Sequence, residues 1–200
     1  VLVDTRADGR NYFNLSDDTF TVLIAGGSRG ARTINNAMID VHKHFQGTKG
    51  IKLIHITGDG EYKSVLSQLG ITDGNGLGDS SVILPYLHDM PKALAAADLA
   101  VFRSGAIGLA ELAVRGIPSV LVPYPYAAED HQTYNARIFV QEGAAHMIVD
   151  QMLSAHDLIG EIEMFMANRD LLSQMGERAL QLGKPNAAHD IAKLALSIAK

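Results

Sequence analysis

Residues 21–45 read TVLIAGGSRGARTINNAMIDVHKHF, and this stretch indicates the fold. Its first five residues are apolar or β-branched, as in a strand that is buried on both faces. The glycines that follow favour a sharp turn, because glycine tolerates backbone angles that other residues avoid. After the turn, apolar side chains recur at helical spacing at Ala31, Ile34, Met38, Val41 and Phe45. A strand, a glycine-rich turn and an amphipathic helix in this order predict the first unit of an α/β fold.

The rest of the chain repeats this alternation. Further short apolar runs lie at residues 51–56, 81–84, 98–102, 118–122 and 144–149. Helical patterns lie between and after them, as at Ala106, Leu109, Ala110 and Ala113, and Ser154 begins a capping-box pattern before another helix. The sequence therefore predicts an α/β protein with a Rossmann-like, parallel six-stranded sheet and helices on both faces.

The domain organisation is predicted from the same pattern. Residues 21–183 are expected to form the Rossmann-like domain, and residues 184–200 its C-terminal helix, after a break at Gly183-Lys184-Pro185-Asn186. Residues 1–20 show little periodicity and are interpreted as a linker or a divergent N-terminal segment. The chain starts without a methionine, so we interpret it as a fragment or an excised domain.

Composition excludes several classes of function. The 200 residues are 47% hydrophobic with a net charge of -5, and the 17 Lys and Arg residues are scattered, so we expect no nucleic-acid partner. The absence of cysteine excludes a disulfide framework, a Cys-based zinc site and a thiol nucleophile. No apolar run approaches the roughly 18 residues of a membrane span, which predicts no transmembrane segment.

The segment Arg103-Ser104-Gly105-Ala106-Ile107-Gly108-Leu109-Ala110-Glu111 follows the fourth predicted strand. Parallel α/β sheets bind ligands beyond the carboxyl ends of their strands, where helix N-termini point outward. The small residues at 104–108 leave helix amides open to a diphosphate, and the Glu111 carboxylate can accept hydrogen bonds from ribose hydroxyls. The alternative is that Glu111 is only a first-turn carboxylate stabilised by the helix dipole.

Two other turns carry weaker signals. In Gly26-Gly27-Ser28-Arg29-Gly30, amides and the Ser28 hydroxyl can receive phosphate oxygens, or Ser28 is merely the N-cap of the next helix. NAD is disfavoured, because G-x-G-x-x-G is absent and Asp59 lies past the expected acidic position. The second turn precedes a helix that is predicted to begin near His131. His131, Gln132 and Asn135 in its first turns can contact sugar hydroxyls, or the segment is a solvated loop capped by Asp130.

Four motifs in order resemble the MurG family of glycosyltransferases, family 28, which convert lipid I to lipid II in peptidoglycan synthesis. They are G-G-S-x-G-A from Gly26, R-S-G-A-x-x-x-x-E from Arg103, G-x-P-x-x-x-V-P from Gly116, and H-Q-x-x-N-A from His131 followed by E-G-A-A. The resemblance runs from about residue 21 to the C-terminus. It implies a GT-B architecture in which this chain is the C-terminal, donor-binding half.

The resemblance also implies an activity. A UDP-GlcNAc-dependent hexosyltransferase would transfer GlcNAc, with inversion and without metal or cofactor, to undecaprenyl-diphospho-N-acetylmuramoyl-pentapeptide. The catalytic base would come from the N-terminal acceptor domain, so no catalytic residue is assigned here and this chain alone is expected to be inactive. None of the 8 histidines is needed as a base, and His42 and His44 face different directions on one helix. The full-length protein is expected to be cytoplasmic and peripheral on the inner face of the plasma membrane.

Donor-binding residues follow from the motifs. The set comprises Gly27, Ser28, Arg29, Gly30, Leu87, Met90, Arg103, Ser104, Gly105, Ala106, Ile107, Gly108, Glu111, His131, Gln132, Asn135 and Arg6. In this assignment, uracil lies against the loop Tyr86-Leu87-His88-Asp89-Met90 through backbone groups of Leu87, and Glu111 holds the ribose. Ser28 and the amides at 104–108 face the diphosphate, and His131 with Gln132 contacts GlcNAc. Arg103 pairs with phosphate or ties neighbouring loops together.

The chain departs from the family pattern at three positions. Arg29 stands where the family usually has Gln, and Gly108 stands where a hydroxyl residue often contacts phosphate. In the linker the family normally has N-P-V-R, whereas this chain reads Val3-Asp4-Thr5-Arg6, so Arg6 is a candidate for the linker arginine. Two other hypotheses remain open at this point. One is another UDP-sugar transferase, hydrolase or epimerase of GT-B fold, and the other is a non-catalytic nucleotide-sugar-binding module.

Overall fold

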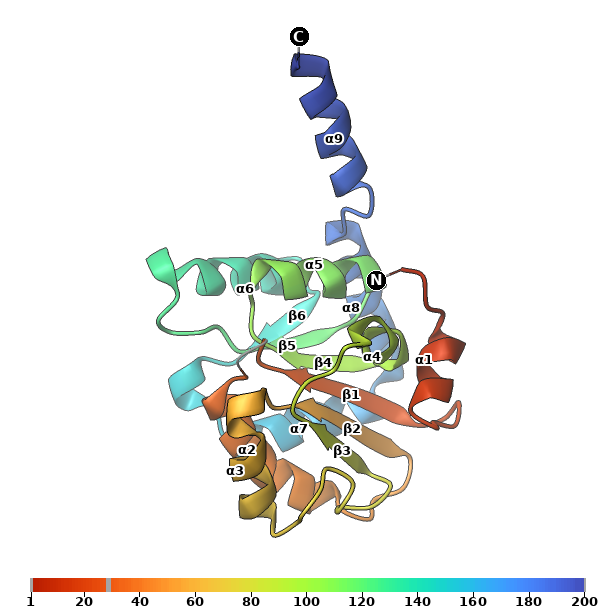
Figure 1. The fold of residues 1–200 in the computed structure, drawn as a ribbon, viewed down its shortest axis with the longest axis vertical. Helices are drawn as coiled ribbons and strands as arrows, with labels where there is room; N and C mark the ends of the chain where they lie inside the picture. Colours follow the sequence, from red (N-terminus) through yellow and green to blue (C-terminus); the bar gives the residue numbers. More distant parts are fainter. Residues whose placement is uncertain (1, 28–29, 200) are drawn as a thin grey trace.

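The computed structural model describes residues 2–27 and 30–199. In that part of the chain, six parallel strands form one sheet between layers of helices (Figure 1). The strands are β1 (Phe20–Ala25), β2 (Ile51–Ile56), β3 (Ser81–Leu84), β4 (Leu99–Phe102), β5 (Ser119–Leu121) and β6 (Ala145–Met147). The helices are α1 (Arg6–Tyr12), α2 (Arg32–Phe45), α3 (Asp59–Leu69), α4 (Met90–Ala96), α5 (Ala106–Arg115), α6 (His131–Gln141), α7 (Ala155–Ala167), α8 (Arg169–Leu182) and α9 (Ala187–Ile198), with short 3-10 turns η1 (Ala128–Asp130) and η2 (Asp150–Met152).

The sheet has the strand order of a doubly wound nucleotide-binding fold. The order is β3-β2-β1-β4-β5-β6, and each neighbouring pair is parallel. The chain runs outward from β1 through β2 to β3 and then crosses back to β4 beside β1, which creates a topological switch point between β1 and β4. The predicted fold class is confirmed, and each predicted strand is present with ends that differ by at most two residues.

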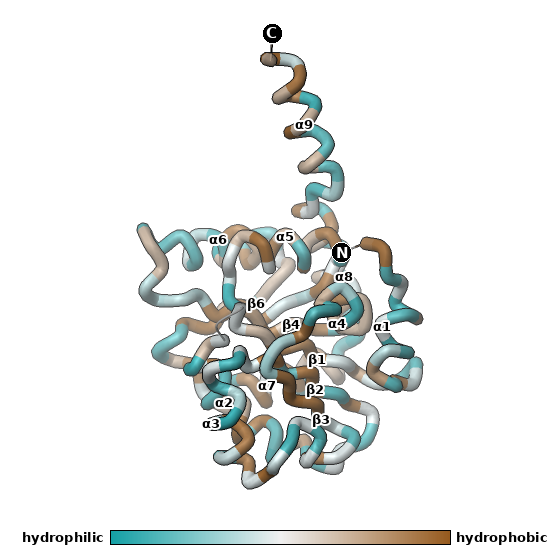
Figure 2. Tube along the Cα trace, in the orientation of Figure 1, coloured by the Kyte–Doolittle hydropathy of each residue, from teal (hydrophilic) through white to brown (hydrophobic). Residues whose placement is uncertain are grey.

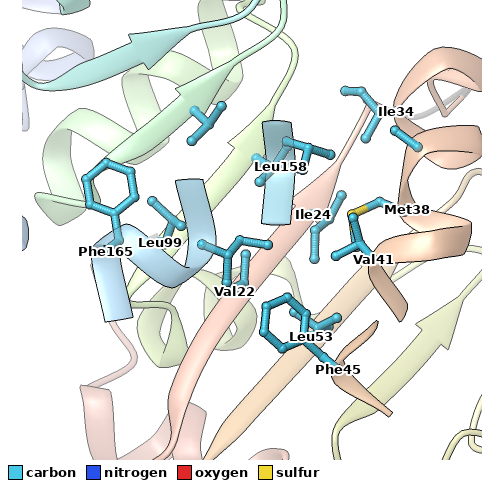
Figure 3. Packing of buried hydrophobic residues seen from close by; sticks show 14 of the residues in the cluster. Val22, Ile24, Ile34, Met38, Val41, Phe45, Leu53, Leu99, Leu158 and Phe165 are labelled. Carbon is cyan, nitrogen blue, oxygen red and sulfur yellow. The ribbon is translucent and has the colours of Figure 1, made fainter. Parts of the chain in front are cut away.

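The central strand β1 separates two hydrophobic layers. Val22 and Ile24 point into a cluster with apolar side chains of α2 and α7, including Met38 and Phe165 (Figure 3). The alternate residue Leu23 points to the other face, where α4, α5 and α6 pack. Figure 2 shows the corresponding concentration of hydrophobic residues along the central strands. Strands that are buried on both faces need continuous apolar sequence, which is why β1 shows no polar alternation at its centre.

Two helix starts agree with their sequence signals. Ser154 is the N-cap of α7, and its Oγ accepts a hydrogen bond from the amide of Asp157 at 3.2 Å. The helix α6 begins at His131, as predicted. Both helices therefore begin at the residues that the local sequence pattern predicted.

The N-terminal residues 1–20, interpreted as a linker or a divergent N-terminal segment, contain a short helix that the sequence pattern did not indicate. Residues Arg6–Tyr12 form α1, which starts with a capping box between Thr5 and Asp8 and packs on α4. The contact is close, because a Cβ atom on Gly9 would lie 2.4 Å from the Lys92 carbonyl oxygen. Arg10 is only 3% exposed and donates to the carbonyl oxygen of Thr19 at 2.8 Å. A seven-residue helix shows little periodicity, and here its stability comes from docking rather than from its own sequence.

The last helix lies apart from the sheet. Residues Ala187–Ile198 are helical, as predicted, but α9 projects away from the body of the molecule (Figure 1) and has no buried residue. Ile191 and Leu194 of its apolar stripe are 67% and 64% exposed. The assignment of residues 184–200 to the same domain, like the other domain boundaries, stays a prediction.

Candidate functional site

A cavity of about 760 Å³ lies beyond the carboxyl ends of the central strands. Ala25 ends β1, Ile56 ends β2 and Phe102 ends β4, and all three contribute to its wall. Its complete lining is Ala25, Gly26, Gly27, Ile56, Pro85, Tyr86, Leu87, His88, Met90, Phe102, Arg103, Gly105, Ala106, Ile107, Gly108, Glu111 and Gln132. Cavities of this size hold small-molecule ligands, and the switch point of an open α/β sheet is where such ligands bind.

The N-terminus of α5 faces this cavity. Gly105 is the N-cap, and the next three residues, Ala106, Ile107 and Gly108, also line the wall. Their amides have no carbonyl partner within the helix, and no described side chain caps this end. Phe102 closes the space beside Gly108, because a Cβ atom there would lie 3.4 Å from the ring. This helix end therefore offers several N–H donors and a positive dipole end to an anion.

Glu111 lies on the same wall of the cavity, further along α5. Its side chain is half-buried, and burial raises the pKa of the carboxyl above its ordinary value. A carboxylate in this position has lone pairs for neighbouring hydroxyl donors. The fold thus brings a helix N-terminus with open amides and a half-buried carboxylate into one cavity.

Another part of the wall comes from the loop after β3 and is largely apolar. Leu87 is buried, Met90 begins α4, and the rings of Tyr86 and His88 meet edge to face with centroids 4.9 Å apart. Together with Phe102 they form a surface suited to a flat ring. Tyr86 and His88 belong to the loop that was predicted to face uracil, whereas the strand-end residues Ile56 and Phe102 were absent from the prediction. Their position at or just after the carboxyl end of a strand is the signal that identifies them.

Ser104 and Asn135 support the cavity wall and are absent from its lining. Ser104 is fully buried, and its Oγ donates to the Gln132 carbonyl oxygen at 2.8 Å. The Asn135 Nδ2 donates to the Ser104 carbonyl oxygen at 3.1 Å. These bonds join the turn before α5 to the first turns of α6.

Gln132 reaches the cavity from α6. Its Oε1 accepts a hydrogen bond from the Tyr124 amide at 3.0 Å, which turns the amide group toward the loop after β5. His131, one residue earlier, is exposed and its Nδ1 lies 2.7 Å from the Ala128 carbonyl oxygen. Of these two predicted residues, only Gln132 lines the cavity.

Arg103 ties three segments together. Its Nη1 donates to the carbonyl oxygens of Val122 and Pro123, each at 3.1 Å, and forms an ion pair with Asp150. Asp150 also accepts a hydrogen bond from the Thr33 hydroxyl at 3.0 Å. Arg103 lines the cavity, but the contacts of its guanidinium are those of a residue that joins neighbouring loops.

The remaining predicted residues lie in different places. Gly27 lines the cavity, whereas Gly30 packs behind it against Thr57. Ser28 and Arg29 lie outside the described residues. The structure does not bring Arg6 to this site, because its guanidinium pairs at 2.6 Å with Asp98, which precedes the amino end of the central strand β4, whereas the cavity lies beyond the carboxyl ends of the strands.

Comparison with known proteins identifies the family. A family profile described as "Glycosyltransferase family 28 C-terminal domain" matches residues 21–194. The chain belongs to this family. Its relatives include an enzyme of Desulforamulus reducens named UDP-N-acetylglucosamine--N-acetylmuramyl-(pentapeptide) pyrophosphoryl-undecaprenol N-acetylglucosamine transferase, which is 40% identical over 197 residues. That match covers 96% of this chain and 52% of the relative, so this family 28 domain spans about half the length of such a protein.

Solved structures agree with this assignment. MurG of Acinetobacter baumannii superposes on 92% of this family 28 domain with a TM-score of 0.77 and 29% sequence identity, over 53% of the MurG chain. A UDP-GlcNAc 2-epimerase from Neisseria meningitidis, bound to UDP-GlcNAc, has a TM-score of 0.63 at 12% identity, with 96% and 48% of the two chains covered. At that identity the epimerase shows a shared GT-B-type fold and nothing more.

The family 28 domain lacks two other kinds of feature in its described part. No group of three or more His, Cys, Asp or Glu residues among residues 2–27 and 30–199 is placed to hold a metal ion. No described helix is long and apolar enough to cross a membrane. His42 and His44 do face different directions, since His42 is buried whereas His44 is exposed and pairs with Glu163 at 2.8 Å.

Proposed function

We propose that this chain binds UDP-GlcNAc as the donor half of an inverting glycosyltransferase. The complete enzyme transfers GlcNAc to undecaprenyl-diphospho-N-acetylmuramoyl-pentapeptide, the step from lipid I to lipid II. The observation that carries the proposal is that the α5 amides and the Glu111 carboxylate share one cavity of about 760 Å³ at the switch point of the sheet. Family membership and the name of the relative at 40% identity support the choice of substrates.

The wall of the cavity divides into three parts that match a nucleoside diphosphate. We assign the diphosphate to the amides of residues 106–108 and the ribose hydroxyls to Glu111, because an anion prefers the helix N-terminus and a carboxylate accepts from hydroxyls. We assign uracil to the surface after β3, where the backbone of Leu87 offers donors and acceptors beside Met90 and Phe102.

The GlcNAc group is assigned to the α6 side of the cavity. Gln132 lines the wall there and carries both donor and acceptor groups for hydroxyls. His131 precedes it at the start of α6, and we assign it to the sugar together with Gln132. The turn at Gly27 is assigned to the diphosphate together with Ser28.

The proposed reaction is a displacement at the anomeric carbon of GlcNAc. The acceptor C4 hydroxyl attacks C1, the bond from C1 to the diphosphate oxygen breaks, and its electron pair leaves with UDP. The amides at the α5 N-terminus stabilise the charge that develops on the leaving diphosphate, since fixed donors need no reorganisation during the step. No described residue is assigned as the base, and we place the base in the part of the full-length relatives that this chain does not span.

The acceptor implies a location. Because the acceptor is lipid-linked, we propose that the full-length protein works at the inner face of the plasma membrane as a peripheral protein. Lipid contact is assigned to the part outside this chain.

Ligand-dependent unfolding tests the donor assignment. UDP-GlcNAc and UDP are expected to stabilise the chain, and a ligand at about 100 times its Kd adds roughly 2.7 kcal/mol to the free energy of unfolding. UDP-glucose measures sugar selectivity, and NAD serves as a negative ligand. The stabilisation by UDP is expected to disappear in Glu111→Ala and to persist in Glu142→Ala, which removes an exposed carboxylate at the end of α6. Stabilisation by NAD alone, or by none of the uridine ligands, would overturn the proposal.

A further inference from the structure

A chain of buried polar side chains runs from the start of β3 to the end of β2. The participating residues are Ser81, His42, His55, Asn35 and Thr57, each at most 1% exposed. Ser81 Oγ lies 2.9 Å from His42 Nδ1, and His42 Nε2 lies 3.1 Å from His55 Nδ1. His55 Nε2 lies 3.0 Å from Asn35 Oδ1, and Asn35 Nδ2 donates to the Thr57 carbonyl oxygen at 3.0 Å. Buried polar groups are costly unless paired, and the polar side-chain atoms named here pair with one another.

The acceptor at one end determines the direction of every bond. A carbonyl oxygen only accepts, so Asn35 presents its NH2 group to Thr57 and its Oδ1 to His55. His55 therefore carries its proton on Nε2 and accepts at Nδ1 from the Nε2–H of His42. His42 in turn accepts at Nδ1 from the Ser81 hydroxyl. The network has one consistent arrangement with both imidazoles neutral, and it ends on the Thr57 carbonyl.

Burial keeps the two rings neutral. It lowers the pKa of His42 to about 4 and lowers the pKa of His55 well below its ordinary value, with the neighbouring His42 adding to the effect. A further proton on His42 would also turn its bond to Ser81 around, so that the hydroxyl would have to accept. The arrangement is therefore stable at neutral pH.

The Thr57 carbonyl supports the glycine-rich turn of the proposed donor site. A Cβ atom on Gly30 would lie 1.9 Å from the Thr57 oxygen, so the turn rests directly on that carbonyl. The Gly30 amide donates to the Gly27 carbonyl oxygen at 2.9 Å, and Gly27 lines the cavity. Movement of Thr57 would therefore be passed to the cavity wall through two backbone contacts.

We propose that Asn35 is a positioning residue for phosphate binding, which holds the Thr57 carbonyl and thereby Gly30 and Gly27 of the glycine-rich turn. Asn35 is buried and absent from the cavity lining, so it acts through Thr57 and Gly30. His55 fixes the orientation of the Asn35 amide, and His42 with Ser81 fixes the tautomer of His55. The inference rests on the proposed function, because it assigns this turn to the diphosphate.

Comparison of UDP with uridine separates positioning from general stability. Uridine reports the base and ribose contacts, and UDP adds the phosphate contacts. In Asn35→Ala we expect the Kd for UDP to rise about tenfold, while the Kd for uridine, from an NMR titration of the folded variant, stays within about twofold. Asn36→Ala removes the exposed neighbour on the same helix and is the matched control, with both constants unchanged. A purely structural Asn35 would lower stability and leave the ratio of the two constants as in the wild type.

A second variant and a spectroscopic measurement keep the test decisive if Asn35→Ala does not fold. His55→Phe retains a ring of similar shape and removes the donor to Asn35, and the same change in the ratio is expected. In the wild type, nitrogen NMR is expected to show neutral Nε2–H tautomers for both His42 and His55 at pH 7. An Nδ1–H tautomer at His55 would overturn the positioning role alone. So would equal losses of affinity for UDP and for uridine in the variants, provided that the wild type binds UDP. Failure of the wild type to bind UDP would overturn the proposed function and the positioning role with it.

Discussion

Arg103 and Asp150 form an ion pair whose side chains are 10% and 11% exposed, although 47 residues separate them in the sequence. The pair connects the turn before α5 with η2, and Arg103 also binds two carbonyl oxygens after β5. The cavity wall at α5 is thus held from behind by a largely buried charge pair.

Removing one partner of this pair is expected to destabilise the fold. A buried charge without its partner costs about 3–5 kcal/mol, so Arg103→Ala and Asp150→Ala should each lower the free energy of unfolding by that order. The double variant should lose less than the sum of both, which urea unfolding measures as a coupling energy. A stable Arg103→Ala variant that no longer binds UDP would instead make Arg103 a phosphate ligand.

Gly30→Ala and Gly47→Ala form a matched pair, because both glycines have a φ of 76°. Gly47 has open space where a Cβ atom would lie, so left-handed backbone strain alone is expected to lower the free energy of unfolding of its variant by about 1 kcal/mol. The Gly30 variant meets the Thr57 carbonyl and should lose more than that, with weaker UDP binding. Equal losses in thermal unfolding and unchanged UDP affinity would show that the turn does not rest on Thr57.

Donor binding should depend on the ionisation of Glu111. Burial raises the pKa of this carboxyl, and the ionised form is the better acceptor for ribose hydroxyls. Affinity for UDP-GlcNAc, whose phosphates keep their charge over this range, should therefore fall as pH decreases, starting above the ordinary titration range of glutamate. Binding calorimetry at several pH values measures how steeply this affinity changes with pH. The same slope in Glu111→Gln would contradict the assignment.

The buried histidines predict how stability depends on pH. Their pKa values are lower in the folded than in the unfolded protein, to about 4 for His42, so the unfolded state binds more protons below pH ~6.5. Stability should fall as pH drops from about 6.5 toward 4, by up to about 1.4 kcal/mol per pH unit for each histidine. The variant His42→Gln should show a shallower decline in urea unfolding between pH 4 and 7. An unchanged slope would mean that these histidines do not titrate between the two states.

Removal of α9 should leave the domain intact. None of its described residues is buried. The free energy of unfolding of a chain that ends at residue 185 is therefore expected to lie within about 0.5 kcal/mol of that of the full chain. UDP affinity should also be unchanged. A large loss of stability in urea would show that α9 packs on the sheet in solution.

The strands and their order of appearance were predictable because their signal is local. Residues 51–56 and 81–84 are apolar runs of strand length, and the structure has β2 and β3 with those bounds. The glycine-rich turns were predictable for the same reason, because the wide range of backbone angles of glycine is a property of the residue itself. The small residues at 104–108 and the carboxylate of Glu111 were visible in one segment in the same way, and the resemblance to glycosyltransferases then assigned them to the diphosphate and the ribose.

Several helices carried no comparable signal. The helix α3 buries only Val65 and Leu66, and α4 is a seven-residue, alanine-rich helix with Pro91 in its first turn. The helix α1 depends on its contact with α4 and on the buried Arg10. Short helices of this kind are stabilised by packing, which local periodicity does not report.

The sequence alone determined the α/β class, the six strands and the two glycine-rich turns, because hydrophobic runs and glycine act through neighbours in the chain. Only the tertiary structure decided which distant groups meet. It joined Asn35 to Thr57, paired Arg103 with Asp150, and placed Arg6 at the amino ends of the strands, away from the cavity at their carboxyl ends. Such contacts depend on how the strands are ordered and how closely the layers pack, and no pattern in a single segment contains that information.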